Sequence, residues 1–267
     1  MTHPVSANPL GDLAGQSCLV TGSSRGIGAA VARGMGAAGM RVAVHYRSSR
    51  AEGEQVRADI AAAGGTAILL HGDVSEPGVV ERLIAETVAG FGRIDRVVNN
   101  AGDLIERWPV ADTSDALFDQ QIAVNIRPVF AACRAAVRQF RTQNAGGGLG
   151  GGIINLGSIA GRTGGGGGSS LYAGSKAFIA TFSRALAKEV AAESIRVNVV
   201  APGVLATPMQ DRTTPAEALE SLRRQVPLQR IGAAEDAVGA FLWLCSDALS
   251  GYVTGQVIEV NGGLLMP

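Results

Sequence analysis

Residues 17–39, SCLVTGSSRGIGAAVARGMGAAG, contain the pattern that decides the fold of this chain. A short apolar run ends at Gly22, and a segment of small residues with helical spacing begins at Gly26. The glycine-rich turn between them fits two kinds of site that lie between a strand and a helix. One is the G-x-S-x-G elbow of serine hydrolases, with Ser24 as the nucleophile. The other is a phosphate-binding turn.

The positions of the histidines exclude the hydrolase. In that fold the triad runs along the chain as serine, acid, histidine. The histidines here are His3, His45 and His71, and none lies beyond residue 71. The elbow would also lie on the first strand, so no earlier strand is available to supply the oxyanion loop.

A phosphate-binding turn gives each glycine a role. Gly22 lets the chain leave the strand in a tight turn, Gly26 lets the backbone approach a pyrophosphate, and Gly28 lets the helix pack closely. The helix N-terminus then offers free N–H groups and a partial positive charge to the phosphates. The spacing is G-x-x-x-G-x-G, and its place after the first strand strengthens the prediction.

Apolar strand segments and helical segments alternate along the rest of the chain. The further strand segments are RVAVHY (41–46), GTAILLHGDV (65–74), IDRVVNNAG (94–102), GGIINLGS (151–158), IRVNVVAPG (195–203) and GQVIEVNGG (255–263). Continuous apolar runs are typical of strands buried on both faces. We therefore predict one Rossmann-like domain over residues 13–267, a doubly wound parallel sheet of about seven strands with helices on both faces.

Composition limits the partners and the compartment. Among 267 residues, 23 Lys and Arg balance 23 Asp and Glu, which gives no reason to expect nucleic-acid or membrane binding. The three cysteines are far apart, which indicates neither a metal site nor a disulfide framework and favours a reducing cytoplasm. Residues 1–12 lack a signal-peptide pattern and are predicted to form a flexible tail. The glycine-rich segment 145–152 is expected to be a flexible loop.

Four residues are candidates for chemistry. Tyr172 and Lys176, in YAGSK, share a face of a helix at spacing i, i+4. A lysine ammonium close to a phenol favours the phenolate and lowers its pKa. Ser158 ends the fifth strand, where α/β folds place ligands, and it either binds a substrate oxygen or caps a helix. Asn125 lies within a helical stretch, where asparagine is mildly unfavourable, and its alternative is an exposed polar position.

Together these motifs resemble the short-chain dehydrogenase/reductase family. TGSSRGIG, NNAG (99–102), Asn125, INLGS (154–158), YAGSK (172–176), RVNVVAPG (196–203) and VNGG (260–263) occur in the family's order. The resemblance implies hydride transfer between a nicotinamide cofactor and a carbonyl or secondary alcohol. It implies Tyr172 as general acid in reduction and base in oxidation, and Lys176 as the residue that lowers its pKa and holds the ribose. Ser158 then binds the reacting oxygen, and Asn125 positions a water that links Lys176 to solvent.

The resemblance also implies a set of cofactor-binding residues. They are Gly22, Ser24, Arg25, Gly26, Ile27, Gly28, Tyr46, Arg47, Ser48, Asp73, Val74, Asn100, Ala101, Gly102, Tyr172, Lys176, Pro202, Gly203, Val204 and Thr207. Tyr46 stands where an NAD enzyme usually carries an aspartate for the ribose hydroxyl. With Arg25, Arg47 and Ser48 as donors to a 2′-phosphate, NADP(H) is favoured and NAD(H) is the second candidate.

The chain departs from the family pattern near the active site. Ser158 and Tyr172 are fourteen residues apart, against a common thirteen, and the extra residue is expected in TGGGGGSS (163–170). The segment after NNAG is unusual, and its Trp108 either lines the substrate pocket or simply packs.

The segment from PLQRIGAAEDAVGAF (227–241) to the C-terminus resembles 3-oxoacyl-(acyl carrier protein) reductases. This implies a 3-oxoacyl thioester substrate, an acyl carrier protein as a candidate partner that docks on Lys188, and a homotetramer. Glycines replace the basic segment before the fifth strand, so a reductase of small ketones, aldehydes or sugars is the alternative. A non-catalytic NADPH-binding sensor or structural subunit is the alternative from another class.

Overall fold

Seven parallel strands form one sheet in the order β3-β2-β1-β4-β5-β6-β7, in a computed structural model that describes residues 10–145 and 150–267. The strands are β1 Ser17–Val20, β2 Arg41–Tyr46, β3 Thr66–His71, β4 Arg96–Asn99, β5 Gly151–Leu156, β6 Ile195–Pro202 and β7 Val257–Val260. The order changes direction between β1 and β4, the position where doubly wound folds bind ligands. The predicted fold class is therefore confirmed.

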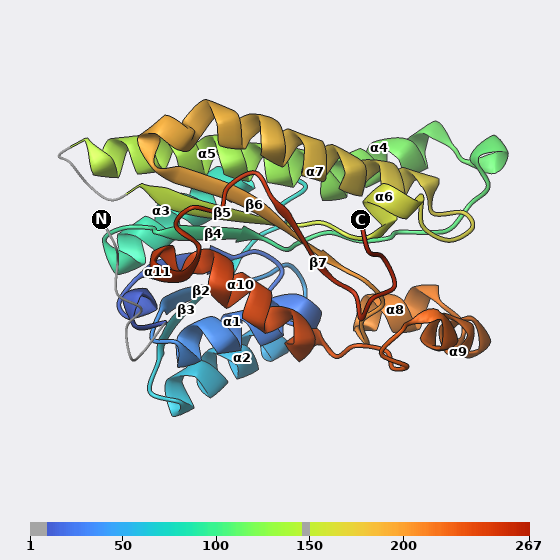
Figure 1. Cartoon of the computed structure of the whole chain (residues 1–267). Helices are drawn as coiled ribbons and strands as arrows, with labels where there is room; N and C mark the ends of the chain where they lie inside the picture. The colour runs from blue at the N-terminus through green and yellow to red at the C-terminus, as the bar shows by residue number, and fades with distance from the viewer. Residues whose placement is uncertain (1–9, 146–149) are drawn as a thin grey trace.

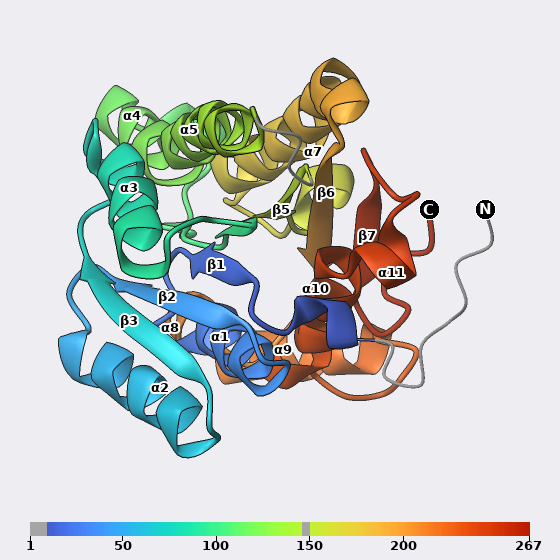
Figure 2. The same ribbon diagram turned by 90° about the vertical axis from the view of Figure 1, so that its left-hand side faces the viewer.

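Helices cover both faces of the sheet, as Figures 1 and 2 show. One face carries α1 (Gly26–Ala37), α2 (Arg50–Ala62) and α10 (Val238–Cys245), and the other carries α3 (Val79–Phe91), α5 (Arg127–Asn144) and α7 (Ser170–Val190). Four short helices gather at the carboxyl end of the sheet: α4 (Asp115–Asn125), α6 (Ala160–Thr163), α8 (Pro208–Thr213) and α9 (Ala216–Gln225). The remaining short elements are η1 Gly11–Leu13, η2 Val110–Asp112, η3 Ala191–Glu193, η4 Ala234–Ala237 and α11 Asp247–Ser250.

The core consists of two apolar clusters, one on each side of the sheet. Leu19 and Ile153 pack in the cluster under α3, α5 and α7, whereas their neighbours Val20 and Ile154 pack under α1 and α10. Successive side chains of a strand point to opposite faces. Both faces are apolar here, which explains why the strands read as continuous apolar runs.

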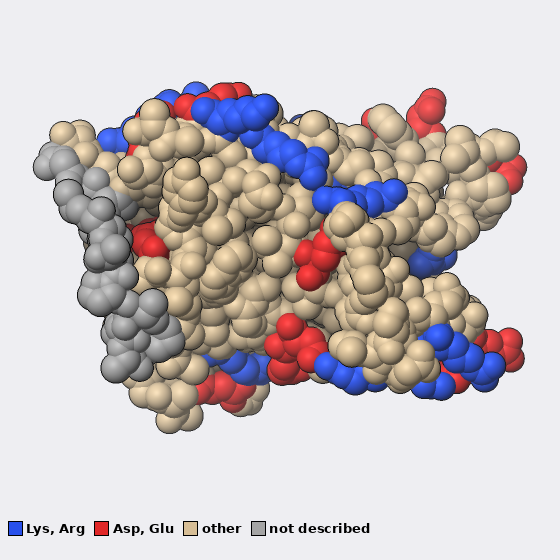
Figure 3. Space-filling model, in the orientation of Figure 1, with Lys and Arg blue, Asp and Glu red and all other residues tan. Residues whose placement is uncertain are grey.

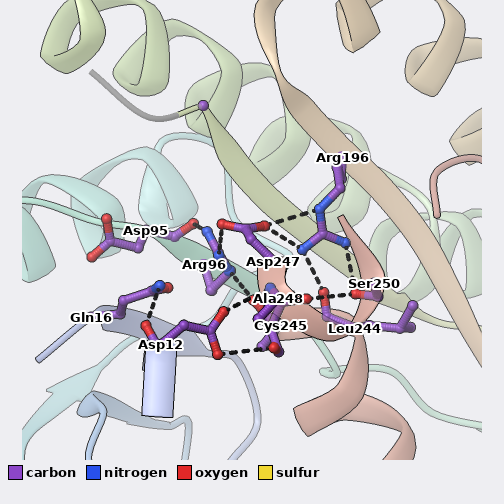
Figure 4. Close-up of polar contacts among 12 residues, drawn as sticks. Asp12, Gln16, Asp95, Arg96, Arg196, Leu244, Cys245, Asp247, Ala248 and Ser250 are labelled. Atoms are coloured by element: carbon purple, nitrogen blue, oxygen red, sulfur yellow. Dashed lines mark hydrogen bonds and ion pairs between the residues drawn. The ribbon is translucent and has the colours of Figure 1, made fainter. Parts of the chain in front are cut away.

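The domain begins before the predicted boundary at residue 13. Residues 1–9 of the predicted tail lie outside the described residues, but Gly11–Leu13 already form η1. The Asp12 carboxylate accepts hydrogen bonds from Ser246 Oγ (2.9 Å) and Ala248 N (3.1 Å). Figure 4 shows these contacts where α10 passes into α11. The prediction of a flexible tail is thus wrong for residues 11 and 12, because both belong to η1 and the Asp12 carboxylate is bonded to the C-terminal helices.

Two buried arginines fasten the same helices to the sheet. Arg96 on β4 and Arg196 on β6 each place an NH2 nitrogen 2.7 Å from the carboxylate of Asp247 (Figure 4). Arg96 Nε also donates to the carbonyl oxygen of Cys245 (2.8 Å). One carboxylate therefore pairs with two guanidinium groups at the amino end of the sheet, away from the ligand-binding end.

The expectation of a flexible loop over 145–152 is wrong at its C-terminal end. Residues 146–149 lie outside the described residues, but Gly151 and Gly152 begin β5. A Cβ at Gly151 would lie 2.5 Å from the Phe140 ring, and one at Gly152 would lie 2.7 Å from the Arg96 side chain. These two glycines are strand residues that make room for buried neighbours.

Candidate active site

The turn between β1 and α1 has the shape expected of a phosphate site. Gly22 and Gly26 have φ angles of 64° and 56°, which favour glycine. A Cβ at Gly28 would lie 2.4 Å from Asn100 Nδ2 and 2.5 Å from Gly22 O. Asn100 Nδ2 donates to the carbonyl oxygens of Thr21 (2.8 Å) and Gly22 (3.0 Å). The glycines thus allow a tight turn that packs on the NNAG loop, at the point where α1 presents its free N–H groups.

A cleft of about 410 Å³ runs along the carboxyl end of the sheet beside this turn. Fourteen of the predicted cofactor residues line it: Gly22, Ser24, Arg25, Gly26, Ile27, Gly28, Arg47, Ser48, Asp73, Val74, Asn100, Ala101, Gly102 and Thr207. Ser24 is therefore part of the cleft wall. The cleft lining does not include Tyr46, Tyr172, Lys176, Pro202, Gly203 or Val204.

The end of β2 presents Arg47 to the cleft rather than Tyr46. The Tyr46 ring packs against His71, with ring centroids 5.0 Å apart. Arg47 NH1 lies 3.7 Å from the Asp73 carboxylate, which also accepts hydrogen bonds from Ser75. Burial acts to raise the pKa of Asp73, but the Ser75 hydrogen bonds and the Arg47 charge bring it below its usual value. The carboxylate of Asp73, in the loop after the neighbouring strand β3, thus partly balances the positive charge of Arg47.

Ser158, Tyr172 and Lys176 come together at the carboxyl end of β5. Lys176, buried on α7, donates from Nζ to the carbonyl oxygen of Leu156 (2.8 Å). The same Nζ lies 5.6 Å from the centroid of the Tyr172 ring. Ser158 Oγ accepts a hydrogen bond (3.1 Å) from the backbone N of Ala160, the first residue of α6, although the residue at the N-cap of that helix is Ile159. Three groups suited to proton donation and oxygen binding therefore share one site.

Burial controls the ionisation of this group. It raises the pKa of Tyr172 to about 12, although a hydrogen bond with Ser158 acts in the opposite direction. Burial also lowers the pKa of Lys176 to about 8. The predicted lowering of the Tyr172 pKa by Lys176 is not found in this structure, because loss of solvent around the phenol has the larger effect.

Asn125 holds the loop that follows β4. It is the last residue of α4, and α5 begins two residues later, so it lies at a break between helices rather than mid-helix. Its side chain pairs with the backbone of Asp103, accepting from N (2.8 Å) and donating to O (2.8 Å). Gln121 Nε2 also donates to Asp103 O (2.8 Å). The buried amide of Asn125 therefore positions Asp103 beside the cleft.

Sequence reasoning missed α8 and its contacts across the cleft. Arg212 forms an ion pair with Asp103 and donates to the carbonyl oxygens of Leu104 (3.1 Å) and Ile105 (2.9 Å). Burial raises the pKa of Asp103, and the Arg212 charge opposes this effect. The only signal in the sequence is the pair of charges, 109 residues apart, which gives no indication of contact.

His45 was considered only as a hydrolase base, and the structure gives it another role. Gly22 N donates to its Nδ1 (2.8 Å), and its Nε2 lies 2.9 Å from Gly72 O. Since Nδ1 accepts a hydrogen bond, the proton of the neutral ring lies on Nε2. Burial lowers the pKa of His45, which favours this neutral form. The ring thus joins the glycine turn to the loop after β3.

Two further findings concern the part of the chain that the structure describes. None of its helices is both long and apolar enough to cross a bilayer. Within the same residues, no group of three or more His, Cys, Asp or Glu side chains is arranged to hold a metal ion.

Comparisons with known proteins agree with this geometry. A family model described as enoyl-(acyl carrier protein) reductase matches residues 22–265. A 3-oxoacyl-(acyl carrier protein) reductase of Synechocystis sp. is 36% identical, over 95% of this chain and 98% of its own. A 3beta-hydroxysteroid dehydrogenase of Eggerthella lenta is 39% identical, over 96% of this chain and 95% of its own.

Solved structures show the same similarity and differ in cofactor. An NADH-dependent reductase complexed with NAD is 32% identical with a TM-score of 0.86, covering 97% of this chain and 100% of its own. A short-chain dehydrogenase of Burkholderia cenocepacia in complex with NADP is also 32% identical with a TM-score of 0.86. The match covers 95% of this chain and 99% of its own.

Proposed function

Since the chain belongs to the short-chain dehydrogenase/reductase family and is an NAD(P)-dependent oxidoreductase of carbonyl and alcohol groups, we propose that it uses NADPH to reduce 3-oxoacyl thioesters. The observation that carries this proposal is the meeting of Ser158, Tyr172 and Lys176 at the carboxyl end of β5. This end of a parallel sheet is where such folds bind their ligands.

The cleft fits a dinucleotide. Its glycine turn leaves no space for a Cβ at Gly28, and the free N–H groups of the first turn of α1 would bind a pyrophosphate there. Gly22, Ser24, Arg25 and Asn100 would hold the phosphate end, with Thr207 on the opposite wall. When bound, the nicotinamide supplies the hydride.

The residues of the chain supply orientation and a proton. Ser158 Oγ binds the substrate carbonyl oxygen, and the Tyr172 hydroxyl donates its proton to that oxygen as negative charge develops. With a pKa of about 12, Tyr172 is protonated at neutral pH, as a general acid must be. Lys176, with a pKa of about 8, is mostly charged there and stabilises the phenolate that remains. Asn125 keeps the loop at Asp103 in place beside these groups.

NADPH is favoured over NADH by the arginines near the adenosine end. Arg25 and Arg47 both line the cleft with Ser48, and β2 ends without a carboxylate. Asp73, 3.7 Å from Arg47, reduces the local positive charge, so the preference is expected to be moderate. The NAD-bound and NADP-bound structures of similar chains indicate that this fold accepts either cofactor.

The thioester substrate is supported by the Synechocystis relative and by the exposed Lys188 on α7, a candidate docking charge for an acidic acyl carrier protein. A reductase of small ketones, aldehydes or sugars is the second candidate. It is favoured by the glycines at 146–148, which leave the segment before β5 without basic residues.

We further propose a homotetramer in a reducing cytoplasm. Phe130 and Phe178 are exposed on α5 and α7, and both pack against Phe182, so an apolar surface faces outward. All three cysteines are free and buried, as expected for a reducing compartment. Sedimentation that gives a fully active monomer at micromolar concentration would contradict the tetramer.

The function is tested by NADPH oxidation with a panel of 3-oxoacyl thioesters, ketones, aldehydes and sugars. Tyr172→Phe should bind NADPH normally and lose about 10²–10⁴-fold in turnover, the range of general acid catalysis. Near-normal turnover in this variant would overturn the mechanism. Tight NADPH binding with no turnover of any substrate by the wild type would instead support the sensor or structural subunit.

A further inference from the structure

Arg107 lies at the mouth of the cleft, clamped between two segments. Its Nε donates to Thr213 O (3.0 Å) at the end of α8, and its NH1 donates to Gly167 O (3.3 Å) in the loop before α7. Asp103 and Ile105, on the same segment as Arg107, line the cleft. Figure 3 shows the molecule hollowed at this end, where α8 and α9 face the region of α4 and α6, with basic atoms inside the hollow.

Among the described residues, no carboxylate forms an ion pair with Arg107. The acids on its own segment have other partners, since Asp103 pairs with Arg212, and Glu106 accepts from Trp108 Nε1 (2.7 Å). A guanidinium has five N–H donors, and two of them contact the carbonyl oxygens of Thr213 and Gly167. Three donors and the positive charge remain for a ligand.

The glycine loop 164–168 allows this clamp. Trp108 N donates to Gly168 O (3.0 Å), and a Cβ at Gly168 would lie 2.9 Å from the same nitrogen. A Cβ at Gly166 would lie 3.4 Å from Arg107 NH1. The sequence predicts one extra residue in this loop, between Ser158 and Tyr172. The same loop therefore holds Arg107 close to the start of α7, the helix that carries Tyr172.

We propose that Arg107 binds an anionic oxygen group of the substrate, a carboxylate or a phosphate. Guanidinium groups bind both through paired, charge-assisted hydrogen bonds. Arg107 is bonded to the loop that leads into α7, the helix that carries Tyr172. Burial raises the pKa of Tyr172, and the Arg107 charge acts against this effect. The inference rests on the proposed function for the place of the reacting carbonyl, beside Tyr172.

Binding is measured by isothermal titration calorimetry of the full chain with NADP⁺ present, so that no reduction occurs. The probes are acetoacetate, its neutral ethyl ester, and coenzyme A. Arg107→Gln should weaken the binding of acetoacetate or coenzyme A by about tenfold to a hundredfold, the effect of losing a charge-assisted hydrogen bond. Ethyl acetoacetate should be little affected. Arg57→Gln removes the same charge from the distant helix α2 and should leave all three unchanged.

The pattern of losses identifies the source of the anion. A loss confined to acetoacetate indicates a carboxylate on the oxo compound, and a loss confined to coenzyme A indicates a phosphate of the thioester arm. Equal losses for charged and neutral probes, no loss for any, or no binding of either anion by the wild type would each overturn the proposal.

Turnover separates this inference from the proposed function. Reduction of acetoacetyl-coenzyme A, acetoacetate and ethyl acetoacetate is followed by NADPH oxidation in the wild type and in Arg107→Gln. If the wild type reduces none of them but binds an anion through Arg107, the proposed function fails and the anion site stands. If the variant reduces charged and neutral substrates with equally changed kcat/KM, the anion site fails and the proposed function stands.

Discussion

Replacing His45 should loosen the cofactor cleft without touching the proposed catalytic group. His45→Ala removes two hydrogen bonds, at 2.8 Å and 2.9 Å, and leaves Gly22 N–H and Gly72 O without a partner. A buried polar group that loses its partner costs about 1–3 kcal/mol. Water can enter the space left by the ring, so we expect a loss of about 2–4 kcal/mol in the free energy of unfolding. For a chain of this size that lowers Tm by roughly 4–16 °C.

Two further substitutions separate the two contacts. The Nδ1 position is two bonds from Cβ, as in an asparagine amide, whereas Nε2 is three bonds away, as in a glutamine amide. His45→Asn should therefore keep the acceptor for Gly22 N–H and retain NADPH affinity, while His45→Gln should keep the donor to Gly72 O and lose affinity. NADPH dissociation constants and thermal unfolding are measured for all three variants, with exposed His71→Ala as the control. Equal NADPH affinity in the Asn and Gln variants, or an Ala variant as stable as the wild type, would refute the role of His45.

The buried imidazole of His45 also predicts how the stability of the protein depends on pH. Burial lowers the pKa of His45, so between that pKa and about 6.5 the unfolded chain binds more protons than the folded chain. The free energy of unfolding then rises with pH in this window. The contribution of His45 is complete above about pH 6.5 and is lost as the pH falls below it. The dependence should disappear in His45→Asn, and an unchanged pH profile in that variant would show that other groups cause it.

Three further predictions concern the cofactor, the proton and the fold. Arg47→Ala should raise KM for NADPH by up to about tenfold and leave KM for NADH unchanged, because one partly balanced charge is removed; equal effects on both cofactors would contradict its role. The kcat/KM for carbonyl reduction should decline above about pH 8, as Lys176 loses its proton, and a decline that persists in Lys176→Arg would point to another group. Asp247→Ala should reduce the free energy of unfolding by about 2–4 kcal/mol, at the low end for a buried ion pair because the carboxylate is half-exposed. Urea unfolding measures it, and a loss below about 1 kcal/mol would show that carbonyl oxygens suffice for Arg96 and Arg196.

The sequence predicts the sheet well because its strands are buried on both faces. Runs such as Leu19–Val20 and Ile153–Ile154 supply apolar side chains to both core clusters, so their pattern is independent of the detail of the packing. Helix α8 was missed because its six residues are too few to show a periodic pattern. Helix α9 buries no residue, but it places Ala216, Leu219 and Leu222 on one face, so its apolar spacing is a signal that the sequence does carry. Tyr46 was predicted to face the cofactor from its place in the strand, but the direction of its ring depends on His71 from the next strand.

Some residues of the site lie on regular helices and strands, and others lie on irregular segments. This difference explains why the motifs predict a reaction but not a substrate. Lys176 and Tyr172 lie on a helix of 21 residues, and Lys176 is anchored to Leu156 at the end of β5. Regular elements hold these groups, so their spacing in sequence fixes their spacing in space. Arg107 instead reaches the mouth of the cleft from a segment without regular structure, which is held by carbonyl contacts to the end of α8 and to the glycine loop 164–168. We expect substrate choice to depend on segments of this kind, whose geometry is set by contacts between distant residues and leaves no periodic pattern in the sequence.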